Sequence, residues 1–466
     1  MNDPDWSQDP RTAMNQAAAW HWQELHFMGQ RMVKASCSIK AAGRSEAVLR
    51  LPPDWAFVWQ GKDTQDWQAG WGMALRLDHQ SLAQADVPAT LTVFGGFPFA
   101  DGASFLDDWG ELSESLWFIP RFLWQQTGEI ATIDIVAIFD ESMGEVAFLA
   151  DLATQGRDFF RAMQRGSWHA RASLDAYVAC VPSPNKLRWQ QMVAEAKAAI
   201  ANLDFAKVVL SRQVHLEFKR SLCAADVFRE LRAGEEESFL FACQSPSSRV
   251  FMGRSPERLL SWQKDEFQMD AIAGTRGRSS TLPGDQAFAR ELQNSPKEQS
   301  EHRLVAVAIA KILEQAAIPF QRVDEEQILR LQHVQHLRSR FKGRLPIAWR
   351  PLELLHKLHP TPAVGGYPRM AAVKFLAQAE GCSRGWFAGG IGLIQGDTGD
   401  FAVGIRSALV HEKKLSIFAG AGIVAASEAE AEWQETAVKM RNFLGLWPAL
   451  ALKFQPSPIS GDHSTR

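Results

Sequence analysis

The sequence predicts a globular protein that mixes β-strands and α-helices, an α/β (α+β) fold class. Residues 26–150 contain many short runs of β-branched and aromatic residues between Gly, Pro and Asp turns, which is typical of strands. After residue 181, strand-like runs alternate with segments in which apolar residues recur every three or four positions, as on amphipathic helices. With 46% hydrophobic and 22% charged residues among 466, the chain can bury a large core.

The composition excludes several functional classes. A net charge of −3 predicts no broad basic field for nucleic acid. No apolar run approaches the ~20 residues that a membrane span needs, and the acidic, polar N-terminus is unlike a signal peptide. The five cysteines are scattered without CxxC spacing, which indicates reduced thiols. We therefore expect a cytoplasmic protein that binds neither nucleic acid nor membrane.

The first part of the chain, residues 1–180, is predicted to be a scaffold half. Strands are expected around residues 91–97, 117–123 and 132–139, and this part carries little that resembles catalytic chemistry. A boundary is predicted near Pro182-Ser183-Pro184, where Ser183 or Asn185 can cap the next helix. Residues 181–455 then form the candidate catalytic half, and residues 456–466 are predicted to be a disordered tail.

The first candidate catalytic residue is Lys207, which opens an apolar strand at residues 207–212. It shares a face with Val209 and Ser211. A buried lysine is costly to keep charged, so its pKa tends to fall, as a general base requires. The alternative is an edge lysine whose ammonium reaches water.

Two further segments place carboxylates where chemistry is possible. Glu257 lies at a predicted turn between two strands, beside the stiff Pro256, although ordinary turn chemistry also explains it. On the helix predicted from Lys297, Glu298 and Glu301 continue the apolar, inward-facing row. Adjacent buried carboxylates repel each other unless a cation or proton compensates, so this row predicts a site.

The C-terminal part offers groups for an anion and a cation. Arg406 is predicted to share a strand face with the small residues Ala402, Gly404 and Ala408, which leaves room for a ligand. Gly420 and Gly422 are predicted to lie at the end of an apolar strand and to precede a helix start, where free N–H groups can meet an anion. One stripe of that helix carries Glu428, Glu432, Glu435 and Lys439. These carboxylates could hold a hard divalent cation; the alternative is a solvated face with a Glu435–Lys439 pair.

Taken together, these motifs resemble the chorismate-utilising enzyme family, and within it the isochorismate synthases of the menaquinone or siderophore type. They occur in the family order and cover about residues 185–445. The carrying motifs are Lys207-Val208-Val209-Leu210-Ser211-Arg212, Ser255-Pro256-Glu257, Ala273-Gly274-Thr275, Ser295-Pro296-Lys297-Glu298 with Glu301-His302, His359-Pro360-Thr361-Pro362-Ala363, Ile405-Arg406, Phe418-Ala419-Gly420-Ala421-Gly422-Ile423-Val424 and Glu432-Trp433-Gln434-Glu435-Thr436.

The resemblance implies a fold and a reaction. The fold would be that of anthranilate synthase component I: two mostly antiparallel sheets packed face to face, with helices outside. The N-terminal half would supply part of both sheets, so that the two halves form one structural domain. The reaction would be the Mg²⁺-dependent isomerisation of chorismate to isochorismate, by water attack at ring carbon 2 with loss of the 4-hydroxyl.

The resemblance also implies residue roles. Lys207 would activate the attacking water, and Glu257 would protonate the leaving hydroxyl. The remaining roles concern metal and substrate binding. Glu301 and Glu435 would bind Mg²⁺ with Glu298 and Glu432 nearby; Arg406, Lys439 and the N–H groups around Gly420 and Gly422 would take the substrate carboxylates; Gly274, Thr275, His359 and Ala363 would line the pocket.

Ala363 favours the isochorismate branch, because the anthranilate, aminodeoxychorismate and salicylate-forming relatives typically have threonine there. Lys207 also fits enzymes that use water rather than ammonia, so no amidotransferase subunit is expected. The alternatives are a salicylate synthase, an aminodeoxychorismate or anthranilate synthase-type enzyme, or a non-catalytic member of the same fold.

Overall fold

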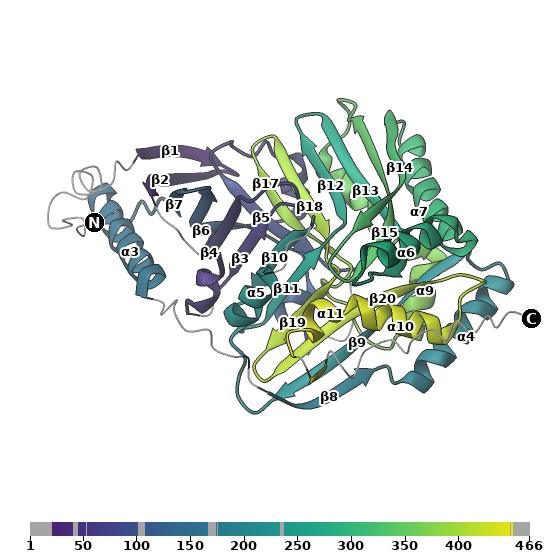
Figure 1. The fold of residues 1–466 in the computed structure, drawn as a ribbon. Helices are drawn as coiled ribbons and strands as arrows, with labels where there is room; N and C mark the ends of the chain where they lie inside the picture. Colours follow the sequence, from purple (N-terminus) through teal and green to yellow (C-terminus); the bar gives the residue numbers. More distant parts are fainter. Residues whose placement is uncertain are drawn as a thin grey trace, which may run out of the picture.

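The computed structural model of the protein describes residues 21–40, 45–52, 54–100, 108–165, 174, 176–233, 237–447 and 449–450 (Figure 1). The predicted tail at residues 456–466 lies outside the described residues.

The strands form two antiparallel sheets that share strand β6 (Leu116–Thr127). The first sheet runs in the spatial order β8 (Tyr177–Ser183), β9 (Lys207–Phe218), β20 (Lys414–Ile423), β19 (Ser407–His411), β11 (Val250–Ser255), β10 (Phe239–Gln244), β3 (Ala56–Gln60), β4 (Trp67–Leu77), β6, β7 (Ile130–Ile138), β2 (Gln30–Lys40) and β1 (His21–Phe27). The second runs in the order β6, β5 (Thr92–Phe97), β17 (Gly390–Gln395), β18 (Thr398–Val403), β12 (Arg258–Gln263), β13 (Glu266–Gly277), β15 (Val334–Arg344) and β14 (Phe320–Arg330). The short β16 (Gly366–Tyr367) pairs with the start of β9.

Strand β6 belongs to both sheets because its partner changes along its length. One edge pairs with β4, while the other pairs with β5 through Leu116–Phe118 and with β7 from Phe122 onward. Pro120, which has no N–H to donate, lies where the second partner changes.

The predicted arrangement of two mostly antiparallel sheets with helices outside is confirmed. Aromatic side chains fill the space between the sheets: Phe57 of β3 stacks on Phe94 of β5, with ring centroids 4.5 Å apart. Two ladders join the halves of the chain, because β3 pairs with β10 and β5 pairs with β17. The N-terminal half therefore contributes to both sheets.

The helices pack against the outer faces and edges of the sheets. They are α2 (His79–Gln84), α3 (Glu145–Arg165), α4 (Lys186–Ala201), α5 (Ala224–Arg232), α6 (Leu282–Asn294), α7 (Pro296–Gln315), α8 (Pro351–Leu358), α9 (Arg369–Ala379), α10 (Ala429–Lys439) and α11 (Arg441–Leu444). Figure 1 shows α6 and α7 beside β13–β15, and α4 and α10 beside β9 and β20.

Local capping explains where the helices near the site begin. Asn185, one of the two predicted caps, accepts a hydrogen bond from the Arg188 N–H at 2.9 Å, whereas Ser183 ends β8. Ser295 caps α7, and Pro296 is its first residue, where a missing N–H costs nothing. This start directs the following turns of α7 toward β13.

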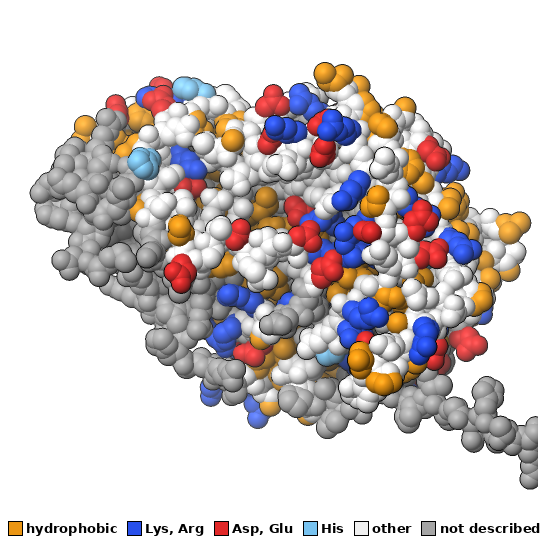
Figure 2. All heavy atoms as spheres, turned by 45° about the horizontal axis from the view of Figure 1, so that its top comes forward, with side chains coloured by type: hydrophobic (Ala, Val, Ile, Leu, Met, Phe, Trp, Pro, Cys, Tyr) orange, Lys and Arg blue, Asp and Glu red, His pale blue; other side chains and the backbone are white. Residues whose placement is uncertain are grey.

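The surface fits the composition. On the face shown in Figure 2, acidic and basic side chains lie intermixed rather than forming a field of one sign. None of the helices that the structure describes combines the length and apolar character that a bilayer span requires.

Candidate active site

Glu257 lies in the turn between β11 and β12, and only 2% of the residue is exposed. Its backbone is fixed: the N–H donates to the Ser255 hydroxyl at 3.3 Å, and the carbonyl accepts from the Val403 N–H at 3.1 Å. Burial, followed by the charge of Asp270, raises the pKa of Glu257 to about 8, although three nearby lysines oppose the rise. The carboxyl group therefore keeps its proton at neutral pH, as a general acid requires.

Lys207 opens β9 and is completely buried, so the alternative of a lysine that reaches water is wrong. Its Nζ lies 3.0 Å from Oε1 of Glu301 on α7. Gly422 of β20 makes this contact possible. A Cβ atom there would lie 2.9 Å from Cε of Lys207 and would collide with the Glu301 carboxylate.

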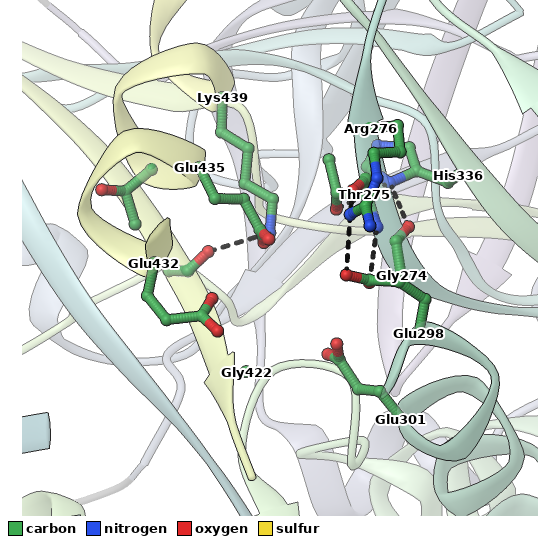
Figure 3. Close-up of polar contacts among 12 residues, drawn as sticks. Gly274, Thr275, Arg276, Glu298, Glu301, His336, Gly422, Glu432, Glu435 and Lys439 are labelled. Carbon is green, nitrogen blue, oxygen red and sulfur yellow. Dashed lines mark hydrogen bonds and ion pairs between the residues drawn. The ribbon is translucent and has the colours of Figure 1, made fainter. Parts of the chain in front are cut away.

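Four carboxylates from two helices face a common gap (Figure 3). Glu298 and Glu301 project from α7, and Glu432 and Glu435 project from α10 on the opposite side. Glu298 and Glu432 are each only 1% exposed, so the alternative of a solvated helix face is wrong for this part of α10. Glu428 of the same predicted stripe is exposed and directly precedes the helix.

Each carboxylate of the gap is paired with a cation. The pairs are Glu298 with Arg276 at 2.9 Å, Glu301 with Lys207 at 3.0 Å, Glu432 with Lys297 at 2.7 Å, and Glu435 with Lys439 at 2.6 Å. The Glu435–Lys439 pair predicted from the sequence is therefore present. Nevertheless, in the part of the chain that the structure describes, no group of three or more His, Cys, Asp or Glu side chains is arranged to hold a metal ion.

The carboxylates still interact unfavourably with one another. Burial, followed by the charge of Glu435, raises the pKa of Glu432 to about 7 despite its contact with Lys297. Burial and Glu435 also raise the pKa of Glu298. Burial acts in the same direction on Glu435 and is the largest single influence, but Lys439, Lys297 and Arg276 together outweigh it and lower the pKa of that carboxylate. The gap therefore favours additional positive charge, and its donors are all oxygens, as Mg²⁺ prefers.

Arg406 lies next to a histidine that the sequence did not reveal. Its Nη2 lies 2.7 Å from Nε2 of His336, whose Nδ1 lies 3.0 Å from the Gly274 carbonyl oxygen. Burial and the charge of Arg406 hold the pKa of His336 well below its ordinary value, so the ring is neutral. The ring therefore donates from Nδ1 to Gly274 and accepts at Nε2 from Arg406.

The predicted environment of Arg406 is wrong in one respect. A continuous strand was expected to place it on one face with Ala402, Gly404 and Ala408. Instead, β18 ends at Val403 and β19 begins at Ser407, and Arg406 has a φ of 52° in the bend between them. The bend turns its guanidinium toward His336.

Gly420 and Gly422 lie within β20, several residues before α10, so the predicted helix start does not supply their N–H groups. They pair with Ser211 and Val209 of β9, whose N–H groups point away from β20 to Glu380 and Gly365. In an antiparallel ladder, these are non-hydrogen-bonded pairs. The N–H groups of both glycines therefore point away from β9, beyond the end of the β19 ladder at Ile417.

A cavity joins these groups. The predicted site residues that line it are Glu257, Gly274, Thr275, Glu301, Ala363, Arg406, Gly420, Gly422 and Lys439. Lys207 lies behind Glu301, and Glu298 contacts the wall because it accepts a hydrogen bond from the Thr275 N–H at 3.1 Å.

His359 does not line this cavity, contrary to the prediction. Its Nε2 donates a hydrogen bond to the Phe99 carbonyl at 3.1 Å, and its ring packs edge-on against Phe97 and Phe99. Burial lowers the pKa of His359 to about 4, so the ring is neutral. This contact fixes the proline-rich loop, and His359 is a structural residue there.

Sequence reasoning missed several residues of the site. Arg384 lines the cavity and donates to the Val364 carbonyl at 2.8 Å, and His336 orients Arg406. Both residues reach the site through tertiary contacts, and neither belongs to a local pattern that could have revealed it. Lys297, in contrast, lies beside the predicted Glu298 and could have been found by its position at the helix start.

The chain is similar to known proteins in sequence and in fold. Residues 57–446 match the model of a family described as chorismate binding enzyme. The chain is 38% identical over 254 residues to the salicylate biosynthesis isochorismate synthase of Pseudomonas aeruginosa, covering 54% of this chain and 53% of the relative, or about half its length. It is 29% identical over 350 residues to isochorismate synthase MenF of Bacillus subtilis, covering 75% and 73%. The solved structure of MenF, the menaquinone-specific isochorismate synthase from Escherichia coli, superposes with a TM-score of 0.77 at 26% identity, covering 94% of this chain and all of that one.

Proposed function

The chain belongs to the family of chorismate binding enzymes, and on this premise we propose that it is an isochorismate synthase, an isomerase that converts chorismate to isochorismate. One observation carries the proposal: a proton-bearing Glu257 lines the same cavity as Glu301, which contacts the buried Lys207. This arrangement offers an acid and a base to one bound ring.

The reaction needs both groups because water is a poor nucleophile and hydroxide a poor leaving group. In the proposed step, the Lys207 ammonium group, which pairs with Glu301, must first lose a proton to solvent; water then bonds to ring carbon 2 and gives a proton to the neutral Lys207 amine. The ring double bonds shift, the bond from carbon 4 to its hydroxyl breaks, and the Glu257 proton leaves with that hydroxyl as water. One water enters and one leaves, so the reaction is an isomerisation.

The two carboxylates of the substrate require positive or N–H partners. Arg406 and Lys439 line the cavity, and the N–H groups of Gly420 and Gly422 point away from β9. Because a guanidinium forms bidentate bonds with a carboxylate, we assign one carboxylate to Arg406. The neutral His336 keeps the guanidinium oriented toward it without competing as a charge.

Mg²⁺ is part of the proposal. Glu301 and Glu435 would hold it, with Glu298 and Glu432 nearby, and the mutual repulsion of these carboxylates supports this assignment. When bound, the ion would neutralise the acidic gap and attract a substrate carboxylate. The present ion pairs, such as Lys297 with Glu432, would have to loosen for the carboxylates to turn toward it.

A product assay tests the function. The purified protein is incubated with chorismate and Mg²⁺ in the absence of ammonia, and the products are separated by HPLC. Isochorismate is expected. Salicylate with pyruvate would instead identify a salicylate synthase, and a requirement for an amidotransferase would identify an aminating enzyme. We also propose that the enzyme is cytoplasmic and acts without an amidotransferase subunit.

A further inference from the structure

A turn from the N-terminal half contacts both neighbours of Glu257 in the sequence. The turn connects β3 to β4. Lys62 Nζ donates to the Pro256 carbonyl at 2.7 Å. The next residue, Asp63, accepts from the Arg258 guanidinium at 2.9 Å. Two consecutive residues of this turn therefore bind the residue before Glu257 and the residue after it.

Asp270 of β13 completes the arrangement. One of its carboxylate oxygens lies 2.7 Å from Lys62 Nζ and also accepts from the Arg258 backbone N–H at 3.3 Å. The side chains of Lys62 and Asp270 are only 2% and 4% exposed. Because both groups are buried, removing one leaves the other with only a distant counter-charge, Glu237 for Lys62 or Arg340 for Asp270, each at 4.0 Å. The pair therefore holds the backbone on both sides of Glu257.

The carboxyl group of Glu257 depends on this backbone. Among the described residues, no donor or cation bonds directly to that carboxyl group, so its position follows from the turn that carries it. A general acid must lie within hydrogen-bond reach of the leaving oxygen, and a displacement of about 1 Å can cost 10²-fold in rate. An anchor on the turn therefore affects catalysis without touching the substrate.

We propose that the buried Lys62–Asp270 ion pair positions Glu257 for proton donation, so that the half of the chain predicted to be a scaffold supplies a positioning residue for catalysis. The inference rests on the proposed function, because it concerns the acid of that reaction. Lys62 and Asp270 act through the turn and are positioning residues rather than catalytic ones.

The charges that face Glu257 supply a second test. After burial, Asp270 from β13 is the largest influence and raises the pKa of Glu257, while Lys207 from β9, Lys62 from the turn and Lys439 from α10 lower it. Loss of the Asp270 charge therefore lowers this pKa. Because catalysis needs the protonated acid, the decline of activity at high pH then begins at a lower pH.

The chain offers a matched control pair. Lys34 of β2 and Asp134 of β7 form another buried ion pair, with Nζ and the carboxylate 2.8 Å apart and side-chain exposures of 11% and 3%. Lys34 also donates to a backbone carbonyl, that of Thr90. This pair lies within the N-terminal half and contacts none of the site residues described above. Variants of the Lys34–Asp134 pair therefore measure what the loss of a buried ion pair does to the protein when Glu257 is not affected.

The first experiment measures kcat and KM for chorismate in Lys62→Met, Lys62→Arg and Lys34→Met, with thermal melts to verify folding. Lys62→Met should lower kcat at least about tenfold with KM changed little, Lys62→Arg should restore most of the rate, and Lys34→Met should keep the wild-type rate. A folded Lys62→Met with wild-type kcat, or an equal loss of rate in Lys34→Met, would overturn the proposal. If Lys62→Met does not fold, the kcat values of Lys62→Arg and Asp270→Asn test the proposal in its place.

The second experiment compares Asp270→Asn with Asp134→Asn. In Asp270→Asn, the high-pH decline of kcat should move down by about 1 pH unit, as expected for removal of a neighbouring like charge, and Asp134→Asn should not move it. Carbon-13 NMR of labelled glutamate, with the Glu257 signal assigned by Glu257→Gln, should give the same shift without substrate. A folded Asp270→Asn that keeps both the wild-type kcat and an unmoved Glu257 titration would overturn the proposal. The NMR result stands even if the wild type does not isomerise chorismate, so failure of the function and failure of the inference are distinguishable.

Discussion

Two regions beside the cavity shift the pKa of a glutamate side chain in opposite directions. In the turn between β11 and β12, Glu257 is buried beside Asp270, and its pKa rises to about 8. On α10, Glu435 is held 2.6 Å from Lys439, and its pKa falls below the ordinary value. One glutamate is therefore a proton donor at neutral pH, whereas the other is an anion.

This difference shows that the groups around a buried glutamate, rather than the residue type, determine whether it is protonated. Burial disfavours the charge of both carboxylates, but only Glu435 has an ammonium group in direct contact. Pairs of titratable groups whose environments separate their pKa values commonly mark an acid and its counterpart. The following changes are chosen to break or sharpen this contrast.

The largest effect is expected for Glu257→Gln, which removes the transferable proton but keeps the shape. We expect kcat to fall by about 10²–10⁴-fold, the usual worth of a general acid, while Mg²⁺ affinity stays unchanged because the carboxylates of α7 and α10 are intact. Steady-state kinetics and calorimetric Mg²⁺ titration measure both. Glu266→Gln, whose side chain is 63% exposed, is the control. Isochorismate formation at the wild-type rate in Glu257→Gln would refute the assigned role.

The next effect tests the base side through Gly422→Ala. The new Cβ would press against Lys207 and Glu301, so one of the two must move. We expect kcat to fall by up to ~10²-fold, as for a displacement of about 1 Å in a reacting group. Gly277→Ala on β13 is the matched control, because a Cβ there meets no atom within 4 Å. Equal activity of the two variants would show that the Lys207–Glu301 contact is dispensable.

A smaller effect is expected for Glu435→Gln, which removes the anion of the contrast. Mg²⁺ affinity of the free enzyme should fall about tenfold or more, because the ion loses a charged oxygen ligand. Calorimetry measures it directly, and the Mg²⁺ dependence of turnover should shift in parallel. Glu430→Gln on the same helix removes a carboxylate that pairs with Lys186 at the surface, and it should leave the affinity unchanged. Unaltered Mg²⁺ binding in Glu435→Gln would exclude it as a ligand.

The contrast also explains how much of the site the sequence could predict. Glu298 and Glu301, like Glu432 and Glu435, are three residues apart on helices, and this spacing is a local property that a single sequence displays. The positions of these helices and of the Lys207 strand followed the hydrophobic pattern, and the two-sheet fold followed the family resemblance.

The residues that orient and position the site groups could not be predicted in this way, because pairing between distant parts of the sequence brings them to the site. His336 lies next to Thr275 through the register of β13 and β15, and Lys62 reaches Pro256 across nearly two hundred positions of sequence. Registers of this kind depend on the packing of the whole sheet, which one sequence does not reveal. The two glycines of β20, in contrast, were predicted to lie at a strand end before a helix, and they do, although residues 424–428 separate that strand from α10.

The smallest effect concerns stability: the contributions of Glu257 and Glu435 to the free energy of unfolding change with pH in opposite directions. Glu257 has a folded pKa of about 8 against an ordinary value of 4.5, so between these pH values the folded chain keeps a proton that the unfolded chain has lost. Unfolding then releases a proton, and the free energy of unfolding should fall as pH rises, by up to ~1.4 kcal/mol per pH unit.

Glu435 behaves in the opposite way. Because its pKa is lowered in the folded chain, it contributes stability above its unfolded pKa, and this stability is lost as pH falls through the folded pKa. Urea unfolding between pH 5.5 and 7.5 with EDTA should therefore show a flatter pH dependence in Glu257→Gln than in the wild type. The flattening should be smaller in Glu435→Gln, where it comes only from Glu432 and Glu298, whose pKa values the loss of the Glu435 charge lowers. Parallel curves for the wild type and Glu257→Gln would mean that Glu257 is already ionised in the folded protein, and the contrast between the two sides of the cavity would then be absent.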